Sequence, residues 1–351
     1  MKFKSFVFAA AACVVAAACG QKVSDTTVIS GSYAEEPADS VTFSTGGEKI
    51  ATVPVVDGKF TAELPADATV MYTMTDGAGL RSRFISDGTP LTIEIAADKG
   101  VTITSMCPKI SVQAKNDAFT TSLHDLWKTY KTLIDSLGDE KKDSLYDAYD
   151  VDYNAINEKV ISENNDNVIA ITAIQNMMYS KPVKELDSLL GTLAPSLDSN
   201  KVVAKMKQTV AAQLATDEGK PFTDFEVNGV KFSEYVGQGK YMLVDFWASW
   251  CGPCKREIPN VKNVYEKYAG EDFDVLSVAV WDKPQATIDT AKVYGIKWSQ
   301  IVDAQHIPTD LYGIQGIPHI ILFGPDGTIL KRDLREAAIE EEVAKYVQPK
   351  K

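Results

Sequence analysis

The sequence predicts a multidomain chain with an N-terminal all-β sandwich or barrel, a central α-helical segment and a C-terminal α/β domain. In the first third, apolar and polar residues alternate with a period of two, and turn dipeptides separate the runs. In the middle third, apolar residues recur at helical spacing. In the last third, near-continuous apolar runs alternate with helical patterns, which is typical of a mixed sheet covered on both faces.

The composition is that of an acidic globular protein. The chain has 351 residues, enough for two or three domains, with 45% hydrophobic and 24% charged residues and a net charge of −12. A nucleic-acid partner would need a basic patch, so this charge argues against one.

Residues 1–18 have the pattern of an export signal. Lys2 and Lys4 precede an uncharged apolar run, Phe6–Ala18, which is too short to span a bilayer. Either the alanines that follow are a plain cleavage site, or Cys19 is a bacterial lipobox cysteine, with Ala16 where that motif usually has Leu. We adopt the lipoprotein interpretation because a cysteine at position 19 has no other evident use. Lipidated Cys19 then begins an anchored linker over residues 19–24.

Residues 25–112 are expected to form the all-β domain. Alternating pairs such as Val41/Phe43 and Leu91/Ile93 are separated by turn dipeptides such as Asp57-Gly58. The spacing of about ten residues per strand favours a small sandwich or barrel. No cluster of His, Cys and carboxylate residues and no phosphate loop occurs in this stretch of sequence, so nothing in it predicts catalysis.

Residues 117–217 are expected to be helical. One stripe at helical spacing includes Leu123, Trp127 and Tyr130, and Asp166 or Asn167 suits the start of a later helix. The Met and aromatic positions are interpreted as core rather than as a cofactor pocket. The segment is therefore predicted to be an interaction or spacer domain.

Residues 219–351 alternate strands and helices. Strands are expected at Met242–Trp247, Val275–Val280, Ile320–Phe323 and Ile329–Lys331, and helices at Cys254–Tyr268, Gln285–Tyr294 and Glu336–Val347. The sequence Trp-Cys-Gly-Pro-Cys, residues 250–254, follows the first of these strands. The cysteines therefore sit at a strand-to-helix turn, where free N–H groups and the helix dipole stabilise a thiolate. A thiolate is the species that attacks disulfides, so the pair predicts a redox site.

The last 130 or so residues resemble a known family. Val244–Cys254 looks like the thioredoxin active-site signature, and Tyr312–Pro318 resembles the segment that carries the cis-proline of thioredoxins. Lys255–Pro259 resembles the TlpA/ResA branch of exported, membrane-tethered thioredoxin-like proteins. The three-part layout resembles Bacteroidetes-type lipoproteins that join a β domain of the DUF4369 type to a thioredoxin-like domain; that part of the likeness rests on pattern and on phrases such as Val56–Phe60.

The motif assigns a role to each of its residues. Cys251 begins the helix and is expected to be the more exposed cysteine, so it is the predicted nucleophile, and Cys254 is the resolving thiol. Trp250 shields the pair from water and offers substrates an apolar face, and Pro253 pins the start of the helix. With Gly252 and Ile317, these two residues form the expected substrate-binding surface.

The resemblance adds three further site residues. Pro318, if cis, places backbone beside Cys251 that can pair with a substrate strand. Asp245 is a candidate for the buried carboxylate that takes the proton of Cys254, since burial raises the pKa of a carboxyl. Glu257 matches the acidic residue that TlpA/ResA-type proteins hold near their cysteines; its alternative is an exposed carboxylate in the first turn of the helix.

The chain departs from thioredoxin at two positions. The strand Val275–Val280 lacks the lysine that thioredoxin carries near its buried aspartate, which leaves the proton path open. His319 follows Pro318 where thioredoxin has Thr, and it either stabilises the thiolate or points away as a strand residue. Cys107 is interpreted as a small buried hydrophobe, with a mixed disulfide to Cys251 as the alternative.

The predicted function is that of a thiol–disulfide oxidoreductase in the bacterial cell envelope, on the periplasmic side, which reduces protein disulfides through Cys251 and Cys254. Gly-Pro between the cysteines favours a reductant, with disulfide-bonded envelope proteins as substrates and a membrane protein as electron donor. No cofactor beyond the redox-active disulfide and no metal is expected, because zinc would need a second Cys/His pair.

The alternative is an envelope binding lipoprotein whose N-terminal domains hold a partner, with redox activity secondary. A thiol peroxidase is disfavoured, since the residues before Cys251 do not match the peroxiredoxin motif.

Overall fold

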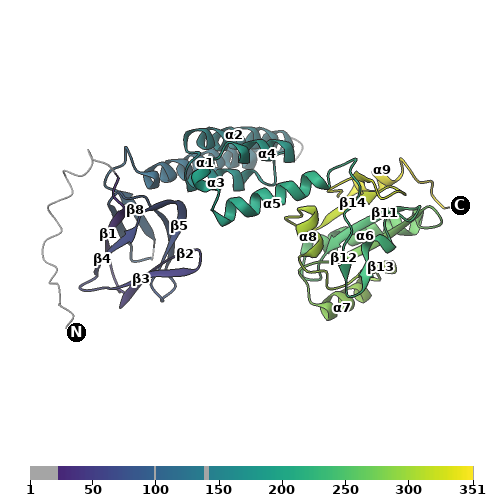
Figure 1. The fold of residues 1–351 in the computed structure, drawn as a ribbon, viewed down its shortest axis with the longest axis horizontal. Coiled ribbons are helices and arrows are strands. Elements are labelled where there is room, and N and C mark those ends of the chain that lie inside the picture. Colours follow the sequence, from purple (N-terminus) through teal and green to yellow (C-terminus); the bar gives the residue numbers. More distant parts are fainter. Residues whose placement is uncertain (1–22, 99, 138–141, 351) are drawn as a thin grey trace. The chain divides into compact units, whose positions relative to one another are not determined.

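The computed structural model describes residues 23–98, 100–137 and 142–350 (Figure 1). The proposed signal and Cys19 therefore lie outside the described residues. The chain divides into two compact units, one formed by the described residues up to Pro182 with Ser188–Ala204, the other by Val183–Asp187 with the described residues from Lys205 onward. Over these described ranges, no helix combines the length and the apolar character needed to cross a bilayer.

The N-terminal unit contains two four-stranded sheets, as expected for a β-sandwich. The first has the order β4-β1-β7-β8 and the second β3-β2-β5-β6. Every pairing is antiparallel except that of β1 with β7, which is parallel. The strands are β1 (Thr26–Tyr33), β2 (Ser40–Thr45), β3 (Glu48–Pro54), β4 (Lys59–Pro65), β5 (Asp67–Thr75), β6 (Arg81–Ser86), β7 (Leu91–Ile95) and β8 (Val101–Ser105). Alternate residues such as Phe43, Leu64 and Ile93 are buried between the sheets, which is the period-two pattern of the sequence.

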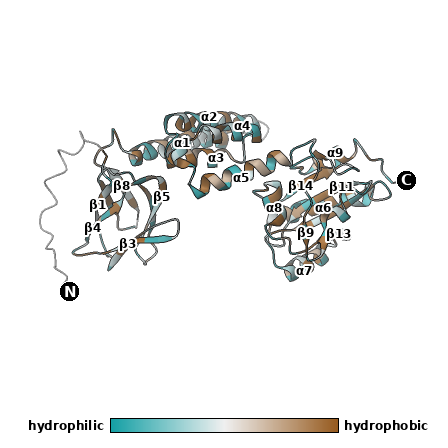
Figure 2. Cartoon of the chain, in the orientation of Figure 1, coloured by the Kyte–Doolittle hydropathy of each residue, from teal (hydrophilic) through white to brown (hydrophobic). Residues whose placement is uncertain are grey.

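Five helices follow the sandwich among the described residues. They are α1 (Val112–Ser136), α2 (Lys142–Glu163), α3 (Val168–Met177), α4 (Val183–Gly191) and α5 (Lys201–Ala215). Asn167 caps α3, because its side chain accepts a hydrogen bond from the N–H of Ile169 at 3.0 Å. The residues of α3 are mostly hydrophobic and seven of them are buried (Figure 2).

Two expectations for this region need correction. Trp127 is 40% exposed, so only part of the aromatic stripe is core; its ring packs edge-on against Tyr149, with the centroids 5.5 Å apart. Cys107 is buried, as expected for a small hydrophobe, but it is disulfide-bonded. Its partner is not Cys251, because Cys251 is bonded to Cys254.

The C-terminal unit contains a five-stranded mixed sheet in the order β13-β12-β11-β14-β15. Its strands are β11 (Tyr241–Trp247), β12 (Phe273–Ala279), β13 (Ser299–Ile301), β14 (His319–Phe323) and β15 (Ile329–Lys331). β11, β12 and β13 are parallel, whereas β14 runs antiparallel to β11 and β15 antiparallel to β14. The helices are α6 (Gly252–Tyr268), α7 (Pro284–Tyr294), α8 (Ile307–Tyr312) and α9 (Ala337–Val343). A short hairpin of β9 (Glu226–Val227) and β10 (Val230–Lys231) precedes them. The predicted α/β domain with a mixed sheet is confirmed.

The two faces of this sheet are covered by different elements. Leu243 and Trp247 of β11 pack with α6 and α9, whereas Val244 and Phe246 pack with residues 225–236 and with Tyr312 of α8. Side chains alternate along a strand, so Asp245 lies on the same face as Leu243 and Trp247, beneath α6.

Candidate active site around Cys251 and Cys254

The two cysteines lie where β11 passes into α6. Their sulfur atoms form a disulfide with an S–S distance of 2.04 Å. Cys251 is the N-cap of α6, and its sulfur accepts a hydrogen bond from the N–H of Cys254 at 3.1 Å. Both cysteines are buried, with exposed fractions of 3% and 1%, so exposure separates them very little. The cap position distinguishes them more clearly: a thiolate on Cys251 would accept hydrogen bonds at the positive end of α6.

The segment Gly316–Pro318 lies against Cys251. The peptide bond between Ile317 and Pro318 is cis. The carbonyl oxygen of Ile317 lies 3.6 Å from Cys251 Sγ, and the Ile317 side chain is partly buried beside the core that holds both cysteines. The structure therefore brings the Ile317–Pro318 peptide next to Cys251 and Cys254. Cys251 and Ile317, which are in contact, are 66 positions apart in the sequence.

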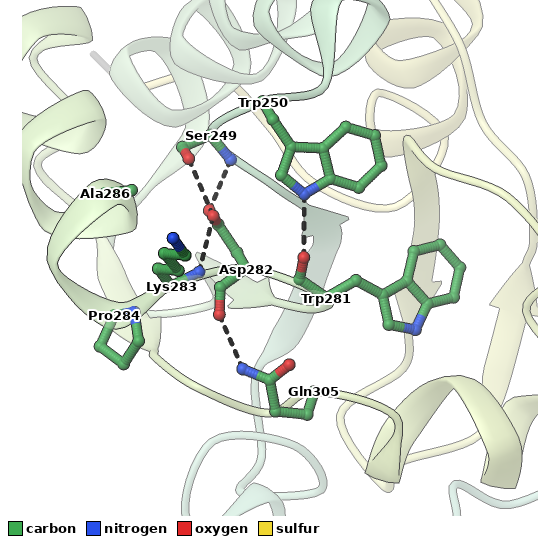
Figure 3. Close-up of a pocket in the computed structure, with 8 residues that line it drawn as sticks. All are labelled: Ser249, Trp250, Trp281, Asp282, Lys283, Pro284, Ala286 and Gln305. Carbon is green, nitrogen blue, oxygen red and sulfur yellow. Dashed lines mark hydrogen bonds between the residues drawn. The ribbon is translucent and has the colours of Figure 1, made fainter.

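Trp250 forms part of the outer wall of the site. It is 59% exposed, and its indole Nε1 donates a hydrogen bond to the carbonyl of Trp281 at 2.9 Å. The two tryptophans lie at one side of a hollow of about 540 Å³, which is also lined by Asp282, Lys283 and Gln305 (Figure 3). Trp250 directly precedes Cys251 in the chain, and its role as an apolar face for substrates stays a prediction.

Asp282 and Trp281, which no sequence motif indicates, hold this wall in place. The carboxylate of Asp282 accepts hydrogen bonds from the N–H of Ser249 at 2.6 Å and from its hydroxyl at 2.9 Å (Figure 3). Burial alone would raise the pKa of Asp282, but the hydrogen bonds from Ser249, Thr287 and Lys283 hold it below its ordinary value. Trp281 has a left-handed backbone (φ 55°), which is costly for a bulky residue. The position of Trp281 and Asp282 in the sequence could have indicated their role. Both follow the carboxyl end of a parallel strand, which is where ligands bind in α/β folds.

Asp245 is buried beneath α6. It is 2% exposed, and its Oδ1 has no hydrogen-bond partner among the described residues. Burial raises its pKa to about 7, and the nearby charge of Glu257 acts in the same direction, while the charge of Arg335 opposes both. A carboxyl with this pKa exchanges protons readily near neutral pH, which suits a general base.

Glu257 lies in the second turn of α6 and is 7% exposed, so it is not an exposed first-turn carboxylate. Its Oε2 accepts hydrogen bonds from the side chain of Asn260 at 2.9 Å and from the N–H of Glu336 at 3.1 Å. These contacts join Glu257 of α6 to Glu336, the residue directly before α9.

His319 points away from the cysteines. It neighbours Ile320 on β14 and lies on the opposite face of the sheet from Asp245, with its ring 6.5 Å from that of Phe246. Its Nδ1 lies 3.2 Å from a carboxylate oxygen of Asp333. Burial lowers the pKa of His319, although Asp333 acts in the opposite direction. Among the two alternatives for this residue, the geometry matches that of a strand residue.

No group of three or more His, Cys, Asp and Glu residues in the described parts of the chain is arranged to hold a metal ion.

The C-terminal part of the chain is similar to known redox proteins. Residues 211–332 match the AhpC/TSA family. The chain is 27% identical over 124 residues to the thiol-disulfide oxidoreductase ResA of Bacillus subtilis (strain 168), a match that covers 34% of this chain and 69% of that protein. It is also similar to the thioredoxin domain of a thiol-disulfide oxidoreductase from Bacteroides vulgatus, at 26% identity, with 38% of this chain and 97% of that chain covered and a TM-score of 0.33.

The homologues are thiol–disulfide oxidoreductases. These relatives confirm the predicted enzyme class, and the structure contains the Cys251–Cys254 pair that this class of enzyme requires. The AhpC/TSA match does not bring the peroxiredoxin motif with it, because Val244 and Ala248 stand where that motif has Pro and Thr before the cysteine.

Proposed function

We propose that the protein is a TlpA/ResA-like oxidoreductase that reduces protein disulfides, with Cys251 as nucleophile and Cys254 as resolving thiol. One observation carries the proposal: the disulfide lies at the N-terminus of α6, with Cys251 as the cap and the Ile317 carbonyl 3.6 Å from its sulfur. The helix end stabilises the attacking thiolate, and the Ile317 backbone offers a hydrogen-bonding edge to the polypeptide that is attacked.

The reaction begins from the reduced dithiol. The Cys251 thiolate attacks one sulfur of the substrate disulfide, the substrate S–S bond breaks, and a mixed disulfide forms while the first substrate thiolate leaves and takes up a proton. Cys254 then loses its proton to Asp245 and attacks Cys251 Sγ. The mixed disulfide breaks, the second substrate thiol is released, and the protein is left with the Cys251–Cys254 bond. Two electrons and two protons pass to the substrate.

Reduction of insulin disulfides by the full mature chain, with dithiothreitol as electron source, tests this function. The wild-type protein should accelerate insulin precipitation, and Cys251→Ser and Cys254→Ser should each fall to the rate of dithiothreitol alone. Cys107→Ser is the matched control, because Cys107 belongs to the other unit and should leave the rate unchanged. Equal rates for the wild-type protein and Cys251→Ser would contradict the proposal.

The cellular setting remains a second part of the proposal. The pattern of residues 1–18 and Cys19 supports an exported lipoprotein tethered at the periplasmic side of the membrane, with a DUF4369-type β domain next to the anchor. A reductant outside the cytoplasm needs electrons, so we include a membrane protein as donor and disulfide-bonded envelope proteins as substrates. Metabolic labelling with radioactive palmitate should mark the wild-type chain but not Cys19→Ala; label in neither chain would contradict the anchor.

A further inference from the structure

The segment 332–336 joins β15 to α9 and contains two strained positions. Asp333 and Glu336 are not glycines, yet both have positive φ, at 56° and 47°. Hydrogen bonds hold the middle and the end of the segment: Leu334 N–H donates to the Ile320 carbonyl at 3.1 Å, and Glu336 N–H donates to Glu257 at 3.1 Å. Strained backbone persists where the surroundings fix it, and it concentrates at functional sites.

Arg335 is the residue that this segment directs toward the active site. Its Nη2 donates a hydrogen bond to the carbonyl of Pro318, and its Nη1 donates to the carbonyl of Leu334 at 2.9 Å. An ion pair of 2.6 Å joins it to Asp333. Pro318 directly follows the Ile317 carbonyl that contacts Cys251, so Arg335 anchors the backbone that borders the nucleophile.

The charge of Arg335 also acts on Asp245. Glu257 and Cys254 lie on α6, which covers this face of the sheet, and the charge of Glu257 acts on Asp245. The strand partners of Asp245 are Ser277 on β12, whose hydroxyl accepts a hydrogen bond from Trp298, and Ile320 on β14.

None of those partners carries a positive charge, and Arg335 is the cation whose charge favours the ionised form of Asp245. His319 lies on the other face of the sheet, and the carboxylate of Asp333 pairs with Arg335 at 2.6 Å, so it acts on Asp245 through the charge of Arg335.

We propose that Arg335 is a positioning residue for disulfide exchange, which holds the Pro318 carbonyl in place and supplies the positive charge that lets the buried Asp245 accept a proton from Cys254. The inference rests on the proposed function of Cys251 and Cys254. It gives this chain a cation for the proton path, although the strand Val275–Val280 carries no lysine. The cation comes instead from the segment after β15, 90 positions along the chain from Asp245.

The pH dependence of the resolving step tests this role. Reduced full-length protein is mixed by stopped flow, from pH 5 to pH 9, with an excess of the symmetric disulfide of a chromophoric reporter thiol. The first phase of reporter release follows the attack of Cys251, which forms the mixed disulfide, and the second phase follows the resolving attack of Cys254. We expect Arg335→Gln to move the midpoint of the rate profile up by about one pH unit, because the ionised Asp245 loses its opposite charge. Arg335→Lys keeps the charge and should keep the wild-type midpoint. Lys331→Gln is the matched control, since that lysine pairs with Glu218 at 2.9 Å and should leave the midpoint unchanged.

A variant of opposite sign protects the test against loss of folding in Arg335→Gln. Asp333→Asn removes the counter-ion of Arg335, and Asn tolerates the positive φ at this position, so its midpoint should move down. The inference is overturned if Arg335→Gln slows release equally at every pH with no shift of the midpoint, or if Asp333→Asn moves the midpoint up. If the wild-type protein releases no reporter at all, the proposed function fails, and with it the basis of the inference.

Discussion

The buried carboxyl of Asp245 makes a specific prediction about stability. The change is Asp245→Asn, which removes the titrating group but keeps the size of the side chain. Because the pKa of Asp245 is raised, the folded protein holds a proton at pH values where the unfolded chain has already released it. The folded state therefore loses stability as the pH rises from about 4 to about 7, and the loss is complete above that range.

The magnitude follows from the two pKa values. The difference between the ordinary value of 3.8 and about 7, at 1.36 kcal/mol per pH unit, corresponds to about 4 kcal/mol. Asp245 is 2% exposed, so solvent screening does not reduce this figure much. Asn carries its own buried polar atoms, which shift the stability of the variant by an amount that does not depend on pH. The prediction therefore concerns the change in the difference between the two proteins, which should grow by up to about 4 kcal/mol in favour of Asp245→Asn between pH 4 and pH 8.

Urea denaturation of the oxidised, full mature chains, followed by tryptophan fluorescence at pH 4 to 9, measures this difference. Four of the five tryptophans, at positions 247, 250, 281 and 298, lie in the C-terminal unit, so the signal reports mainly on that unit. Ser277→Ala is a control on the neighbouring strand, since it removes a buried hydroxyl opposite Asp245 and should show no such dependence on pH. A stability difference between wild type and Asp245→Asn that stays constant from pH 4 to pH 9 would refute the reasoning.

Two further predictions concern the surroundings of the site. Glu257→Gln removes a negative charge that raises the pKa of Asp245, so the midpoint of the stability change with pH should move below about 7; an upward shift in the same urea series would contradict this. Gly313→Ala should destabilise the C-terminal unit by about 1–3 kcal/mol in thermal or urea unfolding, because φ is 63° and an added Cβ would lie 2.5 Å from the Thr209 carbonyl oxygen. Gly191→Ala, where no atom lies within 4 Å of the added Cβ, is the matched control and should cost nothing; equal effects of the two changes would show that the clash is not the cause.

The elements with strong periodicity could be predicted from the sequence. The run Met242–Trp247 and the helical pattern after Cys254 correspond closely to β11 and α6, because long apolar runs and amphipathic stripes arise directly from burial. β13 and α8 were missed. They span three and six residues, which is too short for a periodic pattern to develop. α9 ends at Val343, four residues before the predicted end.

The part of the site that depends on local chain order was predictable, and the part that depends on distant loops was not. Cys251, Cys254 and the segment before Pro318 have recognisable patterns of their own. The direction of His319 could not be read from the sequence, because β14 is buried on both faces and its apolar run does not distinguish them. Arg335 and Asp282 reach the site from loops whose course is set by tertiary contacts, so no spacing in the sequence relates them to the cysteines.

The measurement that tests the account most directly is covalent trapping by the two single-cysteine variants. Full mature chains carrying Cys254→Ser or Cys251→Ser are reduced, incubated with a disulfide-bonded protein such as insulin, quenched with acid and alkylating agent, and separated without reductant. If Cys251 is the nucleophile, Cys254→Ser should accumulate a mixed disulfide that mass spectrometry assigns to Cys251, and Cys251→Ser should accumulate almost none. Equal trapping by both variants, or a bond through Cys254, would contradict the roles that the cap of α6 and the Ile317 carbonyl give to the two cysteines.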